Sequence, residues 1–373
     1  MTLTQELLDV LCCPAERHPL RPVDGDDLLT LNDAIARGRA RYAGGRRVTD
    51  TVESALATPQ GNSFYPIQHG VPVLLPTSRI TIGDGGPDEE RLDEAPPPPD
   101  PSERAWETLA SQWHARQPPT RPAPEDTALL QSLVGEALAG CEAPRALLLG
   151  VTPEIATMSW PAGTRLVAID GSAAMIREVW PARAVAGAAV IRGEWGAMPL
   201  RDGAFDIVVG DASLGFQLYP GKFFEVVGEV RRVLRGGGAV ATRVYTRPEE
   251  RESLDAIFAD LLAGRIGTID YFRWRVLAAL HGDRSHGALF GDLWDAWAAR
   301  VPDPSALVEA LGWPPDAVEI MEALRHSRFP MIFPTLREFR QDLSGAFVEV
   351  ACESPACEDG DRNPTVVLRA RPR

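Results

Sequence analysis

The sequence predicts an α/β fold in which helices alternate with the strands of a mostly parallel sheet. Short apolar runs at 146–149, 166–169, 207–209 and 239–244 are separated by stretches of helical character. This alternation is typical of βαβ units. Gly150, Asp170 and Asp211 lie at or just beyond the ends of the first three of these runs, and Glu194 follows a further run, AAVIRG at 188–193. Because ligands of open parallel sheets bind beyond the carboxyl ends of the strands, these residues predict a binding site.

Composition narrows the class of protein. The 373 residues are enough for two domains, and 38 basic against 52 acidic residues give a net charge of −14. This negative charge argues against a broad surface that binds the phosphate backbone of nucleic acids. A local basic patch would still be compatible with RNA binding. No apolar stretch approaches the roughly 20 residues that span a bilayer, and the N-terminus lacks the pattern of a signal peptide. The five cysteines are typical of reduced thiols, so we expect a cytoplasmic protein with no membrane partner.

Two segments divide the chain. A stretch rich in glycine, proline and acid at 83–100 predicts an extended linker between a small module at 1–82 and a larger domain at 101–373. The segment 248–335 is helix-rich and carries several tryptophans and histidines. At helical spacing most of those tryptophans are expected in a core. The sequence leaves the oligomeric state open.

The region 145–244 resembles the class I S-adenosylmethionine-dependent methyltransferases, of the type 11-like group. The resemblance rests on LVAID, on GAFDIVVGD and above all on EVRRVLRGGG at 229–238. It implies a Rossmann-like sheet, S-adenosylmethionine as cofactor and in-line methyl transfer. It also implies that apolar runs at 346–351 and 365–369 form an antiparallel last pair of strands, which makes 248–335 a helical insertion.

Several residues are candidates for cofactor contacts. Asp170 ends a strand 20 residues after Gly150, where a carboxylate can accept two hydrogen bonds from a ribose diol; the alternative is a cap on the following helix. By the resemblance Glu194 would meet the adenine amino group, unless it lies on a solvated loop. Trp195 either flanks the adenine or fills the core. Further contacts are expected from Val151, Gly171 and Met175.

The loop after the first strand departs from the family pattern. Leu148 stands where the family has an acid, and Gly150 is the single glycine before VTPE. Thr152 can cap a helix there, with Glu154 favourable near the helix N-terminus. Glu154 could also contact the amino group of the cofactor, whose anchoring is otherwise unexplained.

Methyl transfer mainly requires alignment of the acceptor with the methyl group, and some acceptors also need a base. Asp211 is the candidate base by its fold position, and His281 is the candidate from the insertion, although a lone histidine is also common in packing. Trp113, Arg121 and Trp274 are expected to line the substrate pocket. Trp113 could instead belong to a helix that only packs on the sheet. The run GDAS at 210–213 lacks the motif used on amide and base nitrogens, which argues against DNA or glutamine as acceptor.

The first 82 residues are similar to the small Trm112-like family, through LLDVLCCPAERHPL and FYPIQHGVPVLLP. The pattern predicts an α+β module with two short strands around a turn at Gly70. Some family members bind zinc through four cysteines. Cys12 and Cys13 have no partner pair within the module, so we expect no metal and a packing role for both.

Three functions remain open from the sequence. The acidic surface and the large insertion favour a methyltransferase for a small molecule. The Trm112-like module favours an RNA or a translation-related protein as acceptor, because free-standing relatives support such methyltransferases. The altered loop after the first strand is compatible with a protein that binds S-adenosylmethionine or uses it in another reaction.

Overall fold

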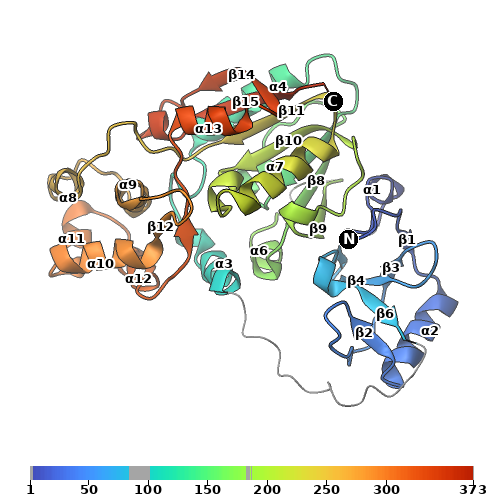
Figure 1. The fold of residues 1–373 in the computed structure, drawn as a ribbon. Coiled ribbons are helices and arrows are strands. Elements are labelled where there is room, and N and C mark those ends of the chain that lie inside the picture. Colours follow the sequence, from blue (N-terminus) through green and yellow to red (C-terminus); the bar gives the residue numbers. More distant parts are fainter. Residues whose placement is uncertain (1–2, 84–100, 182–184, 186, 373) are drawn as a thin grey trace.

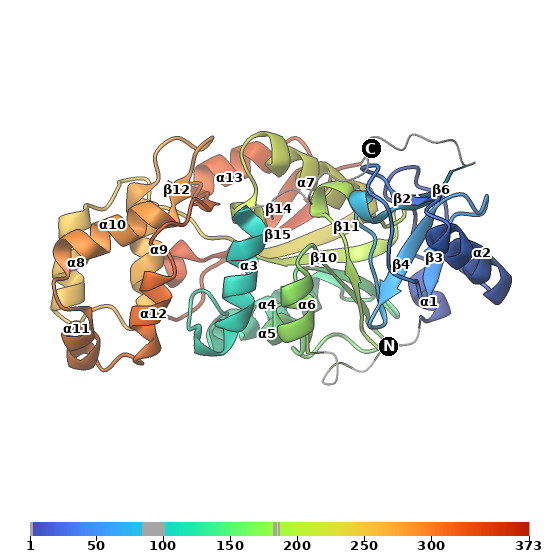
Figure 2. The ribbon, with the colours of Figure 1, turned by 90° about the horizontal axis from the view of Figure 1, so that it is seen from below.

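The computed structural model describes residues 3–83, 101–181, 185 and 187–372. A small N-terminal module lies at one end, a large central sheet lies in the middle, and the helices of the 248–335 segment lie at the opposite end (Figures 1 and 2). Apart from Gly83, the expected linker at 83–100 falls outside the described residues.

The central sheet has seven strands in the order β14-β15-β11-β10-β7-β8-β9. Its members are β7 (Arg145–Leu149), β8 (Arg165–Asp170), β9 (Ala189–Arg192), β10 (Phe205–Asp211), β11 (Leu234–Arg243), β14 (Phe347–Glu353) and β15 (Thr365–Ala370). Strands β7 to β11 pair in parallel, whereas β15 is antiparallel to both β11 and β14. The α/β fold class and the antiparallel last pair are therefore confirmed.

Helices cover both faces of this sheet (Figure 2). One face carries α4 (Pro124–Ala137), α5 (Pro153–Ala156) and α6 (Ala173–Glu178), and the other carries α7 (Gly221–Val233) and α13 (Leu336–Leu343). In β7, Ala146 and Leu148 pack toward the first group, whereas Leu147 and Leu149 pack toward the second. Alternate side chains of a strand face opposite sides, so burial of both faces explains the unbroken apolar run.

The 248–335 segment forms a helical unit with its own core. It contains α8 (Leu254–Leu262), α9 (Ile269–Leu280), α10 (Phe290–Arg300), α11 (Pro304–Leu311) and α12 (Asp316–Glu322), and a short pair of strands, β12 (Ala288–Leu289) and β13 (Pro330–Met331). Helix α9 is buried along nearly its whole length, and Trp274, Trp297 and Trp313 lie in the apolar cluster around it. The expectation that most of these tryptophans belong to a core is met.

The N-terminal module is built on an antiparallel sheet in the order β1-β3-β4-β6-β2, with β5 paired to β4. Its elements are α1 (Gln5–Leu8), β1 (Arg21–Pro22), α2 (Gly25–Ala36), β2 (Ala40–Tyr42), β3 (Ala55–Ala57), β4 (Phe64–Gln68), β5 (Val71–Pro72) and β6 (Ile80–Ile82). His69 and Gly70 both have positive φ angles, of 50° and 79°, as a two-residue turn between β4 and β5 requires. The expected Gly70 turn is present, and four further strands were not predicted.

The module packs against the edge of the central sheet. Val73 lies beside Arg192 of β9 in a parallel bridge, and the Leu74 amide donates to the Arg192 carbonyl at 2.7 Å. Leu11 forms an antiparallel bridge with Leu200, and the two side chains belong to one buried cluster. Glu229 of α7 pairs with Arg17 of the module at 3.0 Å. The two units therefore share a continuous apolar core.

The cysteines of the module are packing residues. Cys12 and Cys13 are buried, and the Cys13 sulfur lies 3.1 Å from the Tyr65 hydroxyl. Within the described residues, no group of three or more His, Cys, Asp or Glu side chains is placed to hold a metal ion. Across the same residues, no helix is long and apolar enough to cross a membrane.

Leu11→Ala should lower the free energy of unfolding by about 2–5 kcal/mol, because Leu11 is fully buried between the module and the sheet. Leu29→Ala is the control, since Leu29 lies in the same module but is 70% exposed and should change stability by at most about 0.5 kcal/mol. Denaturant titrations of both variants measure the effect. Equal effects of the two substitutions would contradict a shared core.

Candidate functional site

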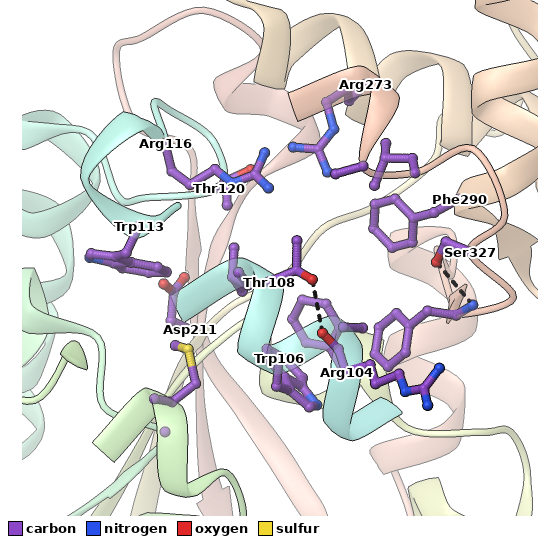
Figure 3. A pocket seen from close by; sticks show the side chains of 18 of the residues that line it. Arg104, Trp106, Thr108, Trp113, Arg116, Thr120, Asp211, Arg273, Phe290 and Ser327 are labelled. Carbon is purple, nitrogen blue, oxygen red and sulfur yellow. Dashed lines mark hydrogen bonds between the residues drawn. The ribbon is translucent and has the colours of Figure 1, made fainter. Parts of the chain in front are cut away.

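A cavity of about 700 Å³ lies between the carboxyl ends of β7, β8 and β10 and the helical segment (Figure 3). Helix α3 (Pro101–Ser111) and the short helix η2 (Trp113–Ala115) contribute a third wall. Residues far apart in the sequence therefore line one space. The sequence-predicted residues that line it are Trp113, Gly150, Val151, Asp170, Met175, Trp195, Asp211 and Trp274.

Asp170 and Gly150 form one corner of the cavity. One carboxylate oxygen of Asp170, Oδ1, accepts a hydrogen bond from the Ser172 amide at 2.8 Å. The other, Oδ2, lies 3.9 Å from where a Cβ at position 150 would stand. Gly150 has a φ of +101°, which residues with a side chain rarely adopt. The loop therefore stays close to Asp170 without covering its oxygen.

Asp170 is not the cap of the helix that follows it. Ser172 occupies the N-cap position of α6, and its hydroxyl accepts from the Met175 amide. This leaves Asp170 free to face the cavity. Burial raises the pKa of Asp170 to about 7, against the opposing effects of the Ser172 amide and the charge of Arg192. A ligand that donates hydrogen bonds to this buried carboxylate stabilises its ionised form.

Trp195 closes the same corner. Its indole Nε1 donates to the carbonyl of Ile169 at 2.9 Å, which fixes the ring beside the end of β8. The ring lines the cavity and also packs against the buried cluster of the sheet, so the packing role is present and contact with an adenine stays a prediction.

Asp211 sits in a buried network of charges. Arg243, at the end of β11, contacts Asp211 at 2.7 Å and Asp126 at 2.9 Å. The hydroxyl of Thr152 donates to the second carboxylate oxygen of Asp211 at 3.3 Å. Burial raises the pKa of Asp211, and the Arg243 guanidinium opposes this. Two carboxylates share one guanidinium here, so the network carries one negative charge in excess.

Thr152 does not act as the loop pattern suggested, whereas Glu154 lies in the first turn of α5, as expected. Thr152 stands at the N-cap position of α5, but its side chain makes no cap and turns to Asp211 instead. Glu154 pairs with Arg121 at 2.5 Å, and the Arg121 guanidinium lies 5.8 Å from the ring centre of Trp113. Glu154 and Arg121 therefore stand behind Trp113 and do not line the cavity.

A continuous aromatic wall faces the strand ends. Trp106 of α3 packs against Phe329 at 5.7 Å between ring centres, and Phe329 packs against Phe290 at 6.0 Å. Trp274 then contacts Phe290 at 6.0 Å and Tyr245 at 5.0 Å. This wall joins α3, α9, α10 and the segment that follows α12, so it gives the far side of the cavity a large aromatic surface.

The comparisons with known proteins bear on the strands of this cavity. Residues 147–242 match the family model described as a methyltransferase domain, and this range includes Gly150, Asp170 and Asp211. This segment is a class I methyltransferase domain. The protein is an S-adenosylmethionine-dependent methyltransferase, and S-adenosylmethionine is its cofactor. No curated protein matches the chain significantly.

Solved structures match the chain at low sequence identity and low TM-score. A Rhodobacter sphaeroides protein named as a zinc-dependent alcohol dehydrogenase has 15% identity and a TM-score of 0.47, over 74% of this chain and 100% of that one. A chain from a complex of the Haloferax volcanii Trm112 methyltransferase activator with a methyltransferase has 13% identity and a TM-score of 0.38, over 72% and 98%. The N-methyltransferase NodS from Bradyrhizobium japonicum, solved with S-adenosylhomocysteine, has 11% identity and a TM-score of 0.42, over 73% and 100%. Such low values say nothing about the substrate of this chain.

Five residues predicted for the site of the methyltransferase do not line the cavity, namely Arg121, Glu154, Gly171, Glu194 and His281. Glu194 is exposed, because Trp195 takes the place at the corner. Gly171 is also exposed, and its carbonyl accepts from Arg192.

His281 belongs to the core of the insertion. It is fully buried at the end of α9, its ring lies 6.3 Å from that of Phe333, and neither ring nitrogen has a hydrogen-bond partner within the described residues. Burial lowers the pKa of His281 to about 4, and the charge of Arg247 adds to this effect. His281 is therefore neutral at ordinary pH and does not line the cavity.

The sequence did not point to several residues that line the methyltransferase cavity, among them Trp106, Arg116, Thr120, Tyr245, Arg273, Phe290 and Phe329. One pattern could have identified Tyr245 and its neighbour Arg243, because a charged residue at the end of an apolar strand is unusual in the core. Arg116 and Arg273 meet only in the folded chain.

Cofactor affinity should depend on the ionisation of Asp170. Because its pKa is about 7 and the ionised form accepts hydrogen bonds, S-adenosylhomocysteine should bind about tenfold more tightly at pH 8 than at pH 6. Asp170→Asn should weaken binding and lose this dependence, whereas Glu194→Gln should keep it. Calorimetric titrations at both pH values test this, and an unchanged pH dependence in Asp170→Asn would contradict it.

The same raised pKa has a consequence for the free protein. The fold binds the Asp170 proton more tightly than the unfolded chain does, so this contribution to stability is complete below pH 3.8 and is lost as the pH rises through about 7.

His281 should have the opposite effect on stability. Its pKa falls from 6.5 to about 4 on folding, so the contribution is present above pH 6.5 and is lost as the pH falls toward 4. Between pH 7.5 and pH 5 this amounts to about 2 kcal/mol. His281→Leu should remove that part of the acid dependence, and His286→Leu, at an exposed position, should not. Denaturant titrations at both pH values measure the difference, and equal acid sensitivity of the His281→Leu variant and the unmodified chain would refute the assignment.

Proposed function

We propose that the protein methylates a small molecule held in the cavity between the strand ends and the helical segment. One observation carries this proposal: a single cavity of about 700 Å³ has the carboxylates of Asp170 and Asp211 on one side and an aromatic wall on the other. Its size lies within the range of ordinary ligand sites, roughly 300–1,000 Å³. The lining is mainly apolar with a few convergent polar groups, which suits a compact organic acceptor.

The residues at the strand ends fit the cofactor. Asp170 would accept hydrogen bonds from the ribose hydroxyls, since its Oδ2 has no partner within the described residues and Gly150 leaves room beside it. Val151, Met175 and Trp195 line the adjoining surface. The excess negative charge of the Asp211 network suits a cofactor that carries positive charge. When bound, S-adenosylmethionine supplies the methyl group from its sulfonium.

Asp211 is the residue that we propose as the catalytic carboxylate. Among the described residues its Oδ2 accepts a hydrogen bond only from the Thr152 hydroxyl, at 3.3 Å, and this hydroxyl can rotate to another acceptor. Asp211 can therefore hold a positive charge or take a proton from an acceptor atom as the new bond forms. Alignment of the acceptor by the two walls contributes the larger effect, about 7–11 kcal/mol in well-oriented systems.

The N-terminal module is proposed to act as a Trm112-like support, without zinc. None of residues 3–83 lines the cavity, and the module instead covers β9 and contacts α7. A supporting role requires no RNA or protein acceptor. A cytoplasmic location fits the five free cysteines.

A transfer assay with S-adenosylmethionine carrying a deuterated methyl group tests the proposal. A cell extract is separated into small-molecule, RNA and protein fractions, and each fraction is incubated with the enzyme. The label should appear in the small-molecule fraction. Label in RNA or protein would favour the macromolecular alternative. Binding without transfer to any fraction would favour a non-methylating use of the cofactor.

The assignment of the cofactor site makes a separate prediction. Asp170→Ala should weaken binding of S-adenosylhomocysteine by about 1.5–3 kcal/mol, because a charge-assisted hydrogen bond is lost. Glu194→Ala is the control, since Glu194 is exposed and outside the cavity, and should change binding little. Calorimetry measures both, and equally small losses would show that the cofactor binds elsewhere.

A further inference from the structure

A buried pair of arginines lies in the wall of the cavity that faces away from the cofactor corner. Arg116 follows η2 and Arg273 lies on α9, and the two side chains meet with Thr120 on one side of the cavity (Figure 3). Both arginines are nearly inaccessible to solvent, with exposures of 5% and 4%. Such residues are rarely buried unless their charge is compensated.

One carboxylate compensates both guanidiniums. Asp270 forms an ion pair with Arg273 and lies 3.7 Å from Arg116. The second oxygen of Asp270 already accepts from the Gln117 amide at 2.9 Å. Two positive charges therefore share one negative charge, and one positive charge is left in excess beside the cavity.

Polar atoms of this cluster also lack partners. Nε and Nη1 of Arg116, Nε of Arg273, Oγ1 of Thr120 and the indole Nε1 of Trp274 are buried without a hydrogen bond to any described residue. Buried donors without partners are costly, so a ligand that satisfies them after a small side-chain shift gains affinity. Burial lowers the pKa of Arg116 to about 9, and the charge of Arg273 adds to this, yet the group stays charged at neutral pH.

We infer that the methyl acceptor is an aromatic or other apolar molecule with a carboxylate that binds to Arg116 and Arg273. The inference rests on the proposed function and specifies its substrate class. Within the cluster of Arg116, Arg273 and Asp270, a monoanion balances the one excess charge, whereas a phosphate dianion would exceed it. Outside this cluster the cavity is also lined by Arg104, Arg325, Arg328 and Glu322. The apolar body of the molecule lies against Trp274 and Phe290, which adjoin Arg273.

The test uses the full chain saturated with S-adenosylhomocysteine, and its probes are naphthoate, its neutral amide and naphthylphosphonate. Naphthoate should bind roughly tenfold or more tightly than the amide, as expected for a charge-assisted hydrogen bond. Equal binding of acid and amide, or no binding of naphthoate at millimolar concentration, would overturn the inference. Tighter binding of the phosphonate than of naphthoate would overturn the assignment to a carboxylate.

Substitutions of the two arginines test whether they cause the preference for naphthoate over its amide. Arg116→Gln and Arg273→Gln should each abolish the preference for the acid and leave the affinity for S-adenosylhomocysteine unchanged. Arg300→Gln is the matched control, because Arg300 lies on α10 of the same helical segment but outside the cavity. A preference that survives both cavity variants, or that is lost in the control, would contradict the site.

A further variant changes the charge without removing an arginine. Asp270→Asn keeps the shape of the side chain and leaves both guanidiniums uncompensated, so both anions should bind more tightly relative to the amide. An unchanged preference would contradict the charge argument. Failure of S-adenosylhomocysteine itself to bind would refute the proposed cofactor site, which is separate from a failure of naphthoate to bind the loaded protein.

Discussion

Arg243 lies at the carboxyl end of β11 and is almost fully buried, with 2% of its surface exposed. It therefore has to find all its partners inside the protein, and it finds them on different elements: Asp211 on β10, Asp126 at the start of α4 and the carbonyl of Pro119 ahead of α4. Removal of one partner would leave an uncompensated buried charge, which is strongly destabilising. This requirement fixes the segment ahead of α4 against the strand ends.

The walls of the cavity follow from that fixed segment. Asp126 also accepts from the Ala123 amide at 2.8 Å, so the start of α4 is held at the same point. Just before it, the Gln117 amide reaches Asp270 of α9, and Thr268 donates to the carbonyl of Pro118 at 2.7 Å. This short stretch of chain thus joins the helical segment to the strand ends. The same stretch places a net negative cluster near Asp211 and a net positive cluster at Arg116 and Arg273.

Sequence patterns were sufficient for the strands and for the Asp170 corner, because both depend on local order: an apolar run, then a carboxylate or a glycine. The same patterns did not predict which side chain stands beside Asp170 in place of Glu194. That side chain is the neighbouring Trp195, whose indole donates a hydrogen bond to the carbonyl of Ile169 on β8. The patterns also failed for His281, which resembles a catalytic residue by type but ends α9 inside an apolar cluster. The arginine cluster could not be predicted, because Gln117 and Asp270 are 153 residues apart in the chain and meet only through tertiary packing.

The contact of Val73 and Leu74 with Arg192 also affects how readily the protein aggregates at high concentration. Strand β9 ends the seven-stranded sheet, and an uncovered edge strand offers unpaired amides and carbonyls to other chains. The module places its own backbone along that edge, and the Leu74 amide takes one of the open carbonyls. At the other end of the sheet, β14 exposes Val348 and Val350, at 42% and 55%. Among the described residues no further strand pairs with β14, so the module covers one of the two sheet edges, which limits intermolecular strand pairing and aggregation.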